Sequence, residues 1–268
     1  MNDLEAVELR RKRWRRARKG LDVLDPREES FGGGGVPSVA GKMSTRLIIL
    51  PEDPEAHVID FDDQFGTWWK EEPIDPHTGQ PSNFGRDEWM TSQASYRYMR
   101  RGEHEWKRYL AISHAGGVEM GLGSHEAVYR LNRNTGVEVN VFRLLTIVGR
   151  VATVLEYFRA VIERYELSGP WEVTLALVGT ENSLLGDFAS GYSRPEDQFE
   201  DELRRCGERH LLIRREFEVW PGDQGEARAV AYRIADQVEG AWGYALRRYL
   251  ITQGDNIGEF DAANYHWR

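Results

Sequence analysis

The sequence has 268 residues, of which 40% are hydrophobic and 29% are charged, and its formal net charge is −9. This length and composition are typical of a folded globular protein and exclude a wholly disordered chain. They also exclude a helical membrane span, because no stretch approaches about 18 uninterrupted apolar residues. The first residues lack the apolar core of a secretory signal, and the single cysteine, Cys206, excludes an internal disulfide. We therefore expect a cytoplasmic protein without a membrane partner.

Residues 1–20 carry a charge opposite to that of the rest of the chain. They hold eight cations and three carboxylates, a net charge of +5, so the remaining 248 residues carry −14. Glu5 and Glu8 come early and the cations come late, which matches the dipole of a helix. The pattern predicts a basic helical arm over 1–21. Its candidate nucleic-acid-binding or partner-binding residues are Arg10, Arg11, Lys12, Arg13, Trp14, Arg15, Arg16, Arg18 and Lys19.

Three interpretations are compatible with this basic arm. Arg and Lys neutralise phosphates, and an aromatic side chain such as Trp14 can stack on a base, so nucleic acid is one partner. The arm can equally dock on a protein, including the acidic body of its own or a sister chain. The third alternative is a solvated helix without a partner.

Residues 22–45 are rich in Pro and Gly, which predicts a linker. The apolar run 46–50, closed by Pro51, indicates a buried strand. The alternating residues 57–62 suggest a second strand or an extended edge. We expect 64–95 to form a long ordered loop, with one helical turn near 86–90.

A β-hairpin is indicated by strands over 107–114 and 118–123, which flank three residues that include two glycines. Residues 124–140 are polar and predict irregular structure. Apolar residues at helical spacing predict a long helix over 141–166, and alternation predicts a strand over 171–178. The later pattern favours a short helix over 196–206, a strand over 210–220 and a long helix over 226–250.

The order of these elements predicts an α+β fold. We expect a largely antiparallel sheet with two long helices packed on one face, preceded by the basic N-terminal helix. The predicted domain organisation is an arm (1–21), a linker (22–45), an α+β domain (46–253) and a C-terminal tail (254–268).

Catalytic signals are weak throughout the sequence. The best metal candidate is the cluster Asp60, Asp62 and Asp63, with His57 nearby, since paired carboxylates can hold Mg²⁺ or Mn²⁺ for hydrolysis. Solvated loop acids are the competing interpretation. No histidine pair has zinc-helix spacing, and no serine elbow occurs. We predict no cofactor, identify no catalytic residue and favour a protein that is not an enzyme.

The chain resembles the α+β module that follows AlbA-like (Schlafen-type) putative DNA-binding domains in bacterial proteins. The resemblance rests on the basic run 14–18, the strand 47–51, the hairpin sequences 108–112 and 116–119, and the helix and strand after them. It covers about residues 10–180. The AlbA-like domain itself is not expected here, so the resemblance implies an accessory module and transfers no functional residue.

Together these observations predict a non-enzymatic bacterial binding or scaffold protein. Its basic arm would contact nucleic acid or a partner protein, or a second copy of the chain, in a regulatory or phage-defence complex. The alternative is a metal-dependent hydrolase or nuclease that uses Asp60 and Asp62.

Overall fold

A computed structural model describes residues 44–71, 88–91, 95–101, 106–123, 128–132, 138–186, 204–222 and 224–243. The predicted basic helical arm and the tail 254–268 lie outside these ranges. The predicted linker (22–45), apart from its last two residues, also lies outside them. The same holds for most of the short helix predicted over 196–206.

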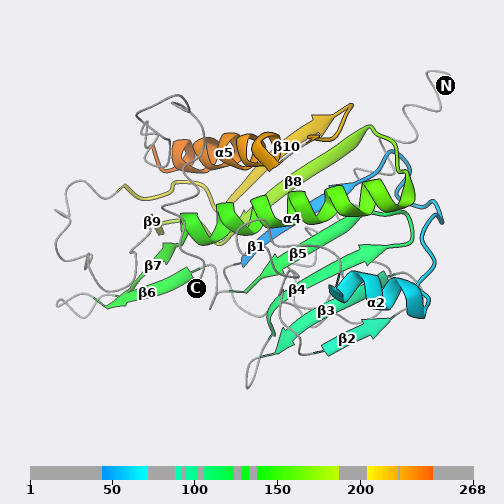
Figure 1. The fold of residues 1–268 in the computed structure, drawn as a ribbon. Helices are drawn as coiled ribbons and strands as arrows, with labels where there is room; N and C mark the ends of the chain where they lie inside the picture. Colours follow the sequence, from blue (N-terminus) through cyan, green and yellow to red (C-terminus); the bar gives the residue numbers. More distant parts are fainter. Residues whose placement is uncertain are drawn as a thin grey trace.

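The main sheet has seven strands in the order β10-β8-β1-β5-β4-β3-β2 (Figure 1). Every neighbouring pair in it is antiparallel. The strands are β1 (Ser44–Leu50), β2 (Glu88–Thr91), β3 (Ser95–Arg101), β4 (Trp106–Ser113), β5 (Val118–Leu122), β8 (Trp171–Val178) and β10 (His210–Phe217). A smaller sheet combines β6 (Val128–Asn132), β7 (Glu138–Phe142) and β9 (Leu184–Leu185), with β7 and β9 parallel.

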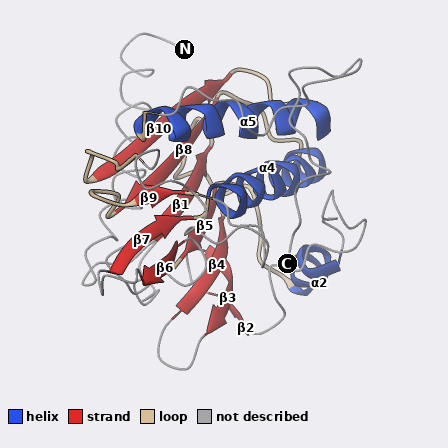
Figure 2. Cartoon of the chain, turned by 90° about the vertical axis from the view of Figure 1, so that its left-hand side faces the viewer, coloured by secondary structure: helices blue, strands red, loops and turns tan. Residues whose placement is uncertain are grey.

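Three helices cover one face of the main sheet (Figure 2). They are α2 (Asp63–Glu71), α4 (Leu144–Tyr165) and α5 (Gln224–Ala241). The face beneath them is apolar because every second strand residue points toward it, for example Leu47, Met120 and Leu175. The predicted α+β fold, with a largely antiparallel sheet and two long helices on one face, is therefore confirmed.

The opposite face of the central strands is buried as well. β1 and β5 are buried along their whole lengths. The side chains that point to this opposite face include Arg46, Ile48 and Glu119. The sheet therefore has an apolar face under the helices and a second buried face that contains charges.

Three predicted elements agree closely with the structure. The hairpin forms from β4 and β5, and its turn residue Gly116 has φ +83°, a left-handed conformation that glycine adopts without strain. The helix predicted over 141–166 is α4, and the strand predicted over 171–178 is β8. In each case the hydrophobic period was long enough to identify the element.

Three predictions about the first half of the chain were wrong. Residues 57–62 do not form a strand, because the backbone N–H groups of Val58 and Ile59 both donate to the carbonyl of His114, at 2.8 Å. The expected long loop over 64–95 contains most of α2, all of β2 and the first residue of β3. The segment 124–140, expected to be irregular, contains β6 and part of β7.

Helix α2 joins the core through aromatic side chains. Trp69 packs edge-on against Tyr157 of α4, with ring centroids 4.4 Å apart, and the Tyr157 hydroxyl donates to the Trp69 carbonyl at 2.7 Å. Trp68 packs against Tyr165, and the Arg164 guanidinium lies 4.8 Å above the Trp68 ring. These contacts fix α2 against the C-terminal half of α4.

Asp62 caps the N-terminus of α2, since its Oδ1 accepts a hydrogen bond from the Phe65 amide at 2.7 Å. We expect Asp62→Ala to lower the free energy of unfolding by about 1 kcal/mol, because the amide loses its partner. Urea unfolding followed by circular dichroism measures this change. Gln64→Ala, at an exposed position of the same helix, is the control and should shift stability by less than about 0.5 kcal/mol. Equal stability of Asp62→Ala and the wild type would contradict the cap.

Candidate functional site

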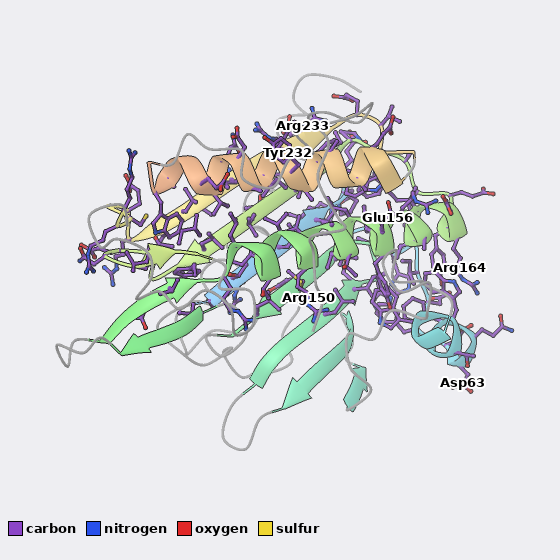
Figure 3. All side chains as sticks on the ribbon, turned by 60° about the vertical axis from the view of Figure 1, so that its left-hand side comes forward. Asp63, Arg150, Glu156, Arg164, Tyr232 and Arg233 are labelled. Atoms are coloured by element: carbon purple, nitrogen blue, oxygen red, sulfur yellow. The ribbon has the colours of Figure 1, made fainter. Side chains whose placement is uncertain are left out.

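The three aspartates of the predicted metal cluster make separate contacts. Asp60 Oδ1 lies 2.9 Å from His57 Nε2, and both side chains are largely exposed. Asp62 caps α2, and Asp63 is exposed in the first turn of that helix (Figure 3). Within the described ranges, no group of three or more His, Cys, Asp or Glu residues could hold a metal ion. The described residues thus give the hydrolase alternative no assembled set of ligands.

A stack of three rings stands beside these aspartates. The His114 ring lies between those of His57 and Phe61, with both centroid separations 4.1 Å. His114 Nδ1 is 2.6 Å from the Ile59 carbonyl, and a carbonyl only accepts, so Nδ1 carries the proton. The stack fastens the loop after β1 to the turn between β4 and β5. Sequence reasoning missed it because His114 and Ile59 are 55 positions apart.

A buried ion pair occupies the second face of the sheet. Arg46 of β1 and Glu119 of β5 lie 3.5 Å apart, between Nη1 and Oε1, and each side chain is 1% exposed. Thr174 of β8 is buried on the same face, because it is registered with Ile48, which is registered with Glu119. The sequence did contain a signal for this pair, since each strand has a single charge among apolar neighbours.

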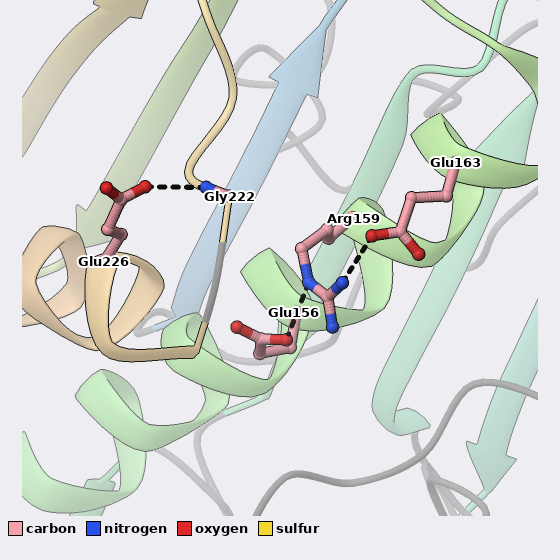
Figure 4. A network of polar contacts seen from close by, with 5 residues as sticks. All are labelled: Glu156, Arg159, Glu163, Gly222 and Glu226. Carbon is pink, nitrogen blue, oxygen red and sulfur yellow. Dashed lines mark hydrogen bonds and ion pairs between the residues drawn. The ribbon is translucent and has the colours of Figure 1, made fainter.

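A second polar network lies along α4 (Figure 4). Arg159 donates through Nε to Glu156 Oε2, at 3.2 Å, and through Nη1 to Glu163 Oε1. Partial burial tends to lower the pKa of Arg159, but the charges and hydrogen bonds of the two glutamates outweigh it and raise that pKa. At the start of α5, Glu226 Oε2 accepts from the Gly222 amide at 2.6 Å. Each of these contacts ties a helix to its own neighbouring turn, which is a structural role.

Cys206 lies in the core rather than in a reactive setting. It is 1% exposed, and its Sγ lies 3.5 Å from the Glu208 carbonyl, to which the thiol donates. Burial among apolar residues is typical of a structural cysteine. The adjacent Arg204 and Arg205 are exposed, so they point away from this core position.

The predicted binding residues of the basic arm lie outside the described residues. These are Arg10, Arg11, Lys12, Arg13, Trp14, Arg15, Arg16, Arg18 and Lys19. The structure does place the strand that they lead to. β1 is an interior strand of the main sheet and pairs with β8 on one side and β5 on the other.

Comparison with family models, with curated proteins and with solved structures gives no match for this chain. None of the helices that the structure describes is both long and apolar enough to span a bilayer.

Proposed function

We propose that this chain is a nucleic-acid-binding protein whose basic arm contacts the phosphate backbone, while the α+β body acts as its scaffold. The observation that carries the proposal is the division of charge between +5 in residues 1–20 and −14 in the rest. An acidic body repels a polyanion, so binding has to be concentrated in local basic regions.

The composition of the arm supports a phosphate partner. Eight of the ten residues from 10 to 19 are Arg or Lys, and six of these eight are Arg. Arg binds phosphate through a planar fork of donors, and each neutralised phosphate releases a counterion. Trp14 lies within the run and supplies an aromatic face on which a base can stack.

The attachment of the arm supports the same role. Gly20 and Ser44 are separated by 23 residues, a length that spans at most about 80 Å. This length allows the arm to follow a bound strand while β1 remains fixed in the sheet. From the resemblance to modules associated with AlbA-like domains, we place the protein in a bacterial cytoplasmic complex with a regulatory or phage-defence role.

Neutralising the arm within the full chain tests this function. The variant replaces the eight arm cations with Gln, and Arg233→Gln, on the exposed side of α5, is the control. Fluorescence anisotropy with a labelled DNA duplex and a single-stranded RNA, at about 50–200 mM salt, gives the affinity and its salt dependence. We expect binding by the wild type and the control to weaken steeply with salt, and the arm variant to lose most of this affinity.

Equal binding by the arm variant and the wild type, or no binding by the wild type, would contradict the proposal. A different outcome supports the alternative of protein docking. In that case the wild type binds neither DNA nor RNA but retains a protein partner from cells, and the arm variant loses that partner. Circular dichroism of each variant shows whether the body remains folded.

A further inference from the structure

A second basic region lies within the acidic body. Residues 204–215 contain five arginines and one glutamate, a net charge of +4. The chain outside this region and the arm therefore carries −18.

The second half of this region, 210–215, lies in β10 at one edge of the main sheet, and 204–209 lead into that strand. Among the described strands, β10 pairs only with β8, and it ends the strand order (Figure 1). Four of the five arginines are exposed, and we call them the basic edge. They are Arg204, Arg205, Arg209 and Arg214.

The backbone of the basic edge is held in place by hydrogen bonds to the segment after β8. The Cys206 amide donates to the Ser183 carbonyl at 3.1 Å, and the Asn182 amide donates to the Cys206 carbonyl at 2.9 Å. The Gly179 and Thr180 amides both donate to the Arg209 carbonyl, at 3.0 Å. The backbone that carries these cations is therefore held in place, so little backbone ordering is needed when an anion binds.

The charges of Arg209 and Arg214 are not neutralised by the described residues around them. Arg209 and Arg214 form no ion pair within the described part of the chain. The Arg205 guanidinium donates to the Asn182 carbonyl at 2.8 Å, a contact that leaves its positive charge uncompensated. Exposed, uncompensated guanidinium groups favour a phosphate ligand.

The start of β1, the strand to which the arm is connected, lies near this edge. Ser44, the first residue of β1, is registered with Val178 of β8, and Val178 is registered with His210 of β10. Two strand spacings are about 10 Å, so the chain that leads from the arm begins close to Arg209. Both basic regions can therefore contact one polyanion.

We propose that the basic edge is a second phosphate-contacting surface, which binds the backbone of the same nucleic acid as the arm. This inference rests on the proposed function and extends it to named residues of the folded body. Glu208 and Glu181 are the exposed acids beside Arg209 and Asn182, and Glu216 and Glu218 are exposed near the other end of β10. The nucleic acid is thus expected over 204–214 and is repelled from the C-terminal end of the strand.

The double variant Arg209→Gln/Arg214→Gln in the full chain tests the basic edge. Neither residue makes an ion pair with another described residue, so the fold should be preserved, as circular dichroism can verify. With a labelled DNA duplex, the slope of log affinity against log salt should decrease in magnitude by about 2, since each lost contact removes about 0.9. Arg233→Gln on α5 is the control and should leave the slope unchanged.

The possible outcomes separate this inference from the proposed function. Loss of binding in the arm variant, with an unchanged slope in the Arg209→Gln/Arg214→Gln variant, overturns the basic edge and leaves the arm's role intact. Failure of the wild type to bind nucleic acid overturns both. Polyglutamate serves as a further probe. If the wild type binds polyglutamate as tightly as nucleic acid, and the Arg209→Gln/Arg214→Gln variant does not, the partner is an acidic protein and not a nucleic acid.

Discussion

Replacing Glu119 with Leu should lower the free energy of unfolding by about 3–5 kcal/mol, because the substitution removes a buried carboxylate that pairs with the Arg46 guanidinium. Both side chains are 1% exposed, so water does not compensate the guanidinium within the folded protein. The measurement is urea unfolding of the full chain, followed by tryptophan fluorescence and circular dichroism.

A double-mutant cycle distinguishes the loss of the ion pair from a simple packing defect. Arg46→Met/Glu119→Leu removes both charges and should be much more stable than Glu119→Leu, close to the wild type or above it. The interaction energy from the cycle should approach about 3 kcal/mol. If the double variant is as unstable as the sum of the two single variants, the pair is not coupled and the prediction is wrong.

The ion pair of Arg46 and Glu119 illustrates which features of the fold could be predicted from the sequence. β1 was identified because its apolar run is buried on both faces, a pattern that requires no knowledge of the partner strands. Arg46 was visible as a charge at the start of that run. Its partner was not predictable, because the register that brings Glu119 to β1 depends on the whole antiparallel sheet.

Two of the wrong predictions share one physical cause. The strand 88–91 has only four residues, and 128–132 contain one arginine and one asparagine, so their hydrophobic alternation is weak. These segments are strands because neighbouring strands supply backbone hydrogen bonds, which the local sequence does not encode. Conversely, 57–62 alternates, yet Ile59 is buried through a loop that is anchored to His114.

The candidate binding surface was only partly visible in the sequence. The basic arm is evident because its eight cations fall within the ten residues from 10 to 19. The basic edge is less evident, since its arginines are interrupted by Cys206, Glu208 and three apolar residues. The sheet topology shows that this stretch lies two strands from the start of β1. Charge clusters that a sheet assembles from separate segments need the strand order before they can be recognised.

The last prediction concerns the aromatic core between α4 and the sheet. Phe158 is fully buried, and its ring lies edge-on to Trp171 and Trp220, with centroid separations of 5.0 and 4.7 Å. Phe158→Ala should lower the free energy of unfolding by about 3–5 kcal/mol, because it removes apolar contacts and opens a cavity between the two indoles. Chemical unfolding measures the loss, and the near-ultraviolet circular dichroism of the two tryptophans should change as well.

Val219→Ala is the matched control, since this side chain is 82% exposed and close in sequence to Trp220. It should change the free energy of unfolding by less than about 0.5 kcal/mol and leave the tryptophan signal unaltered. Wild-type stability in Phe158→Ala would show that α4 does not depend on this cluster. The expected loss of stability, by contrast, would show that the same core holds the end of β10, because Trp220 also packs against Phe217 at the end of that strand. The basic edge would then owe its fixed position to the aromatic core beneath α4.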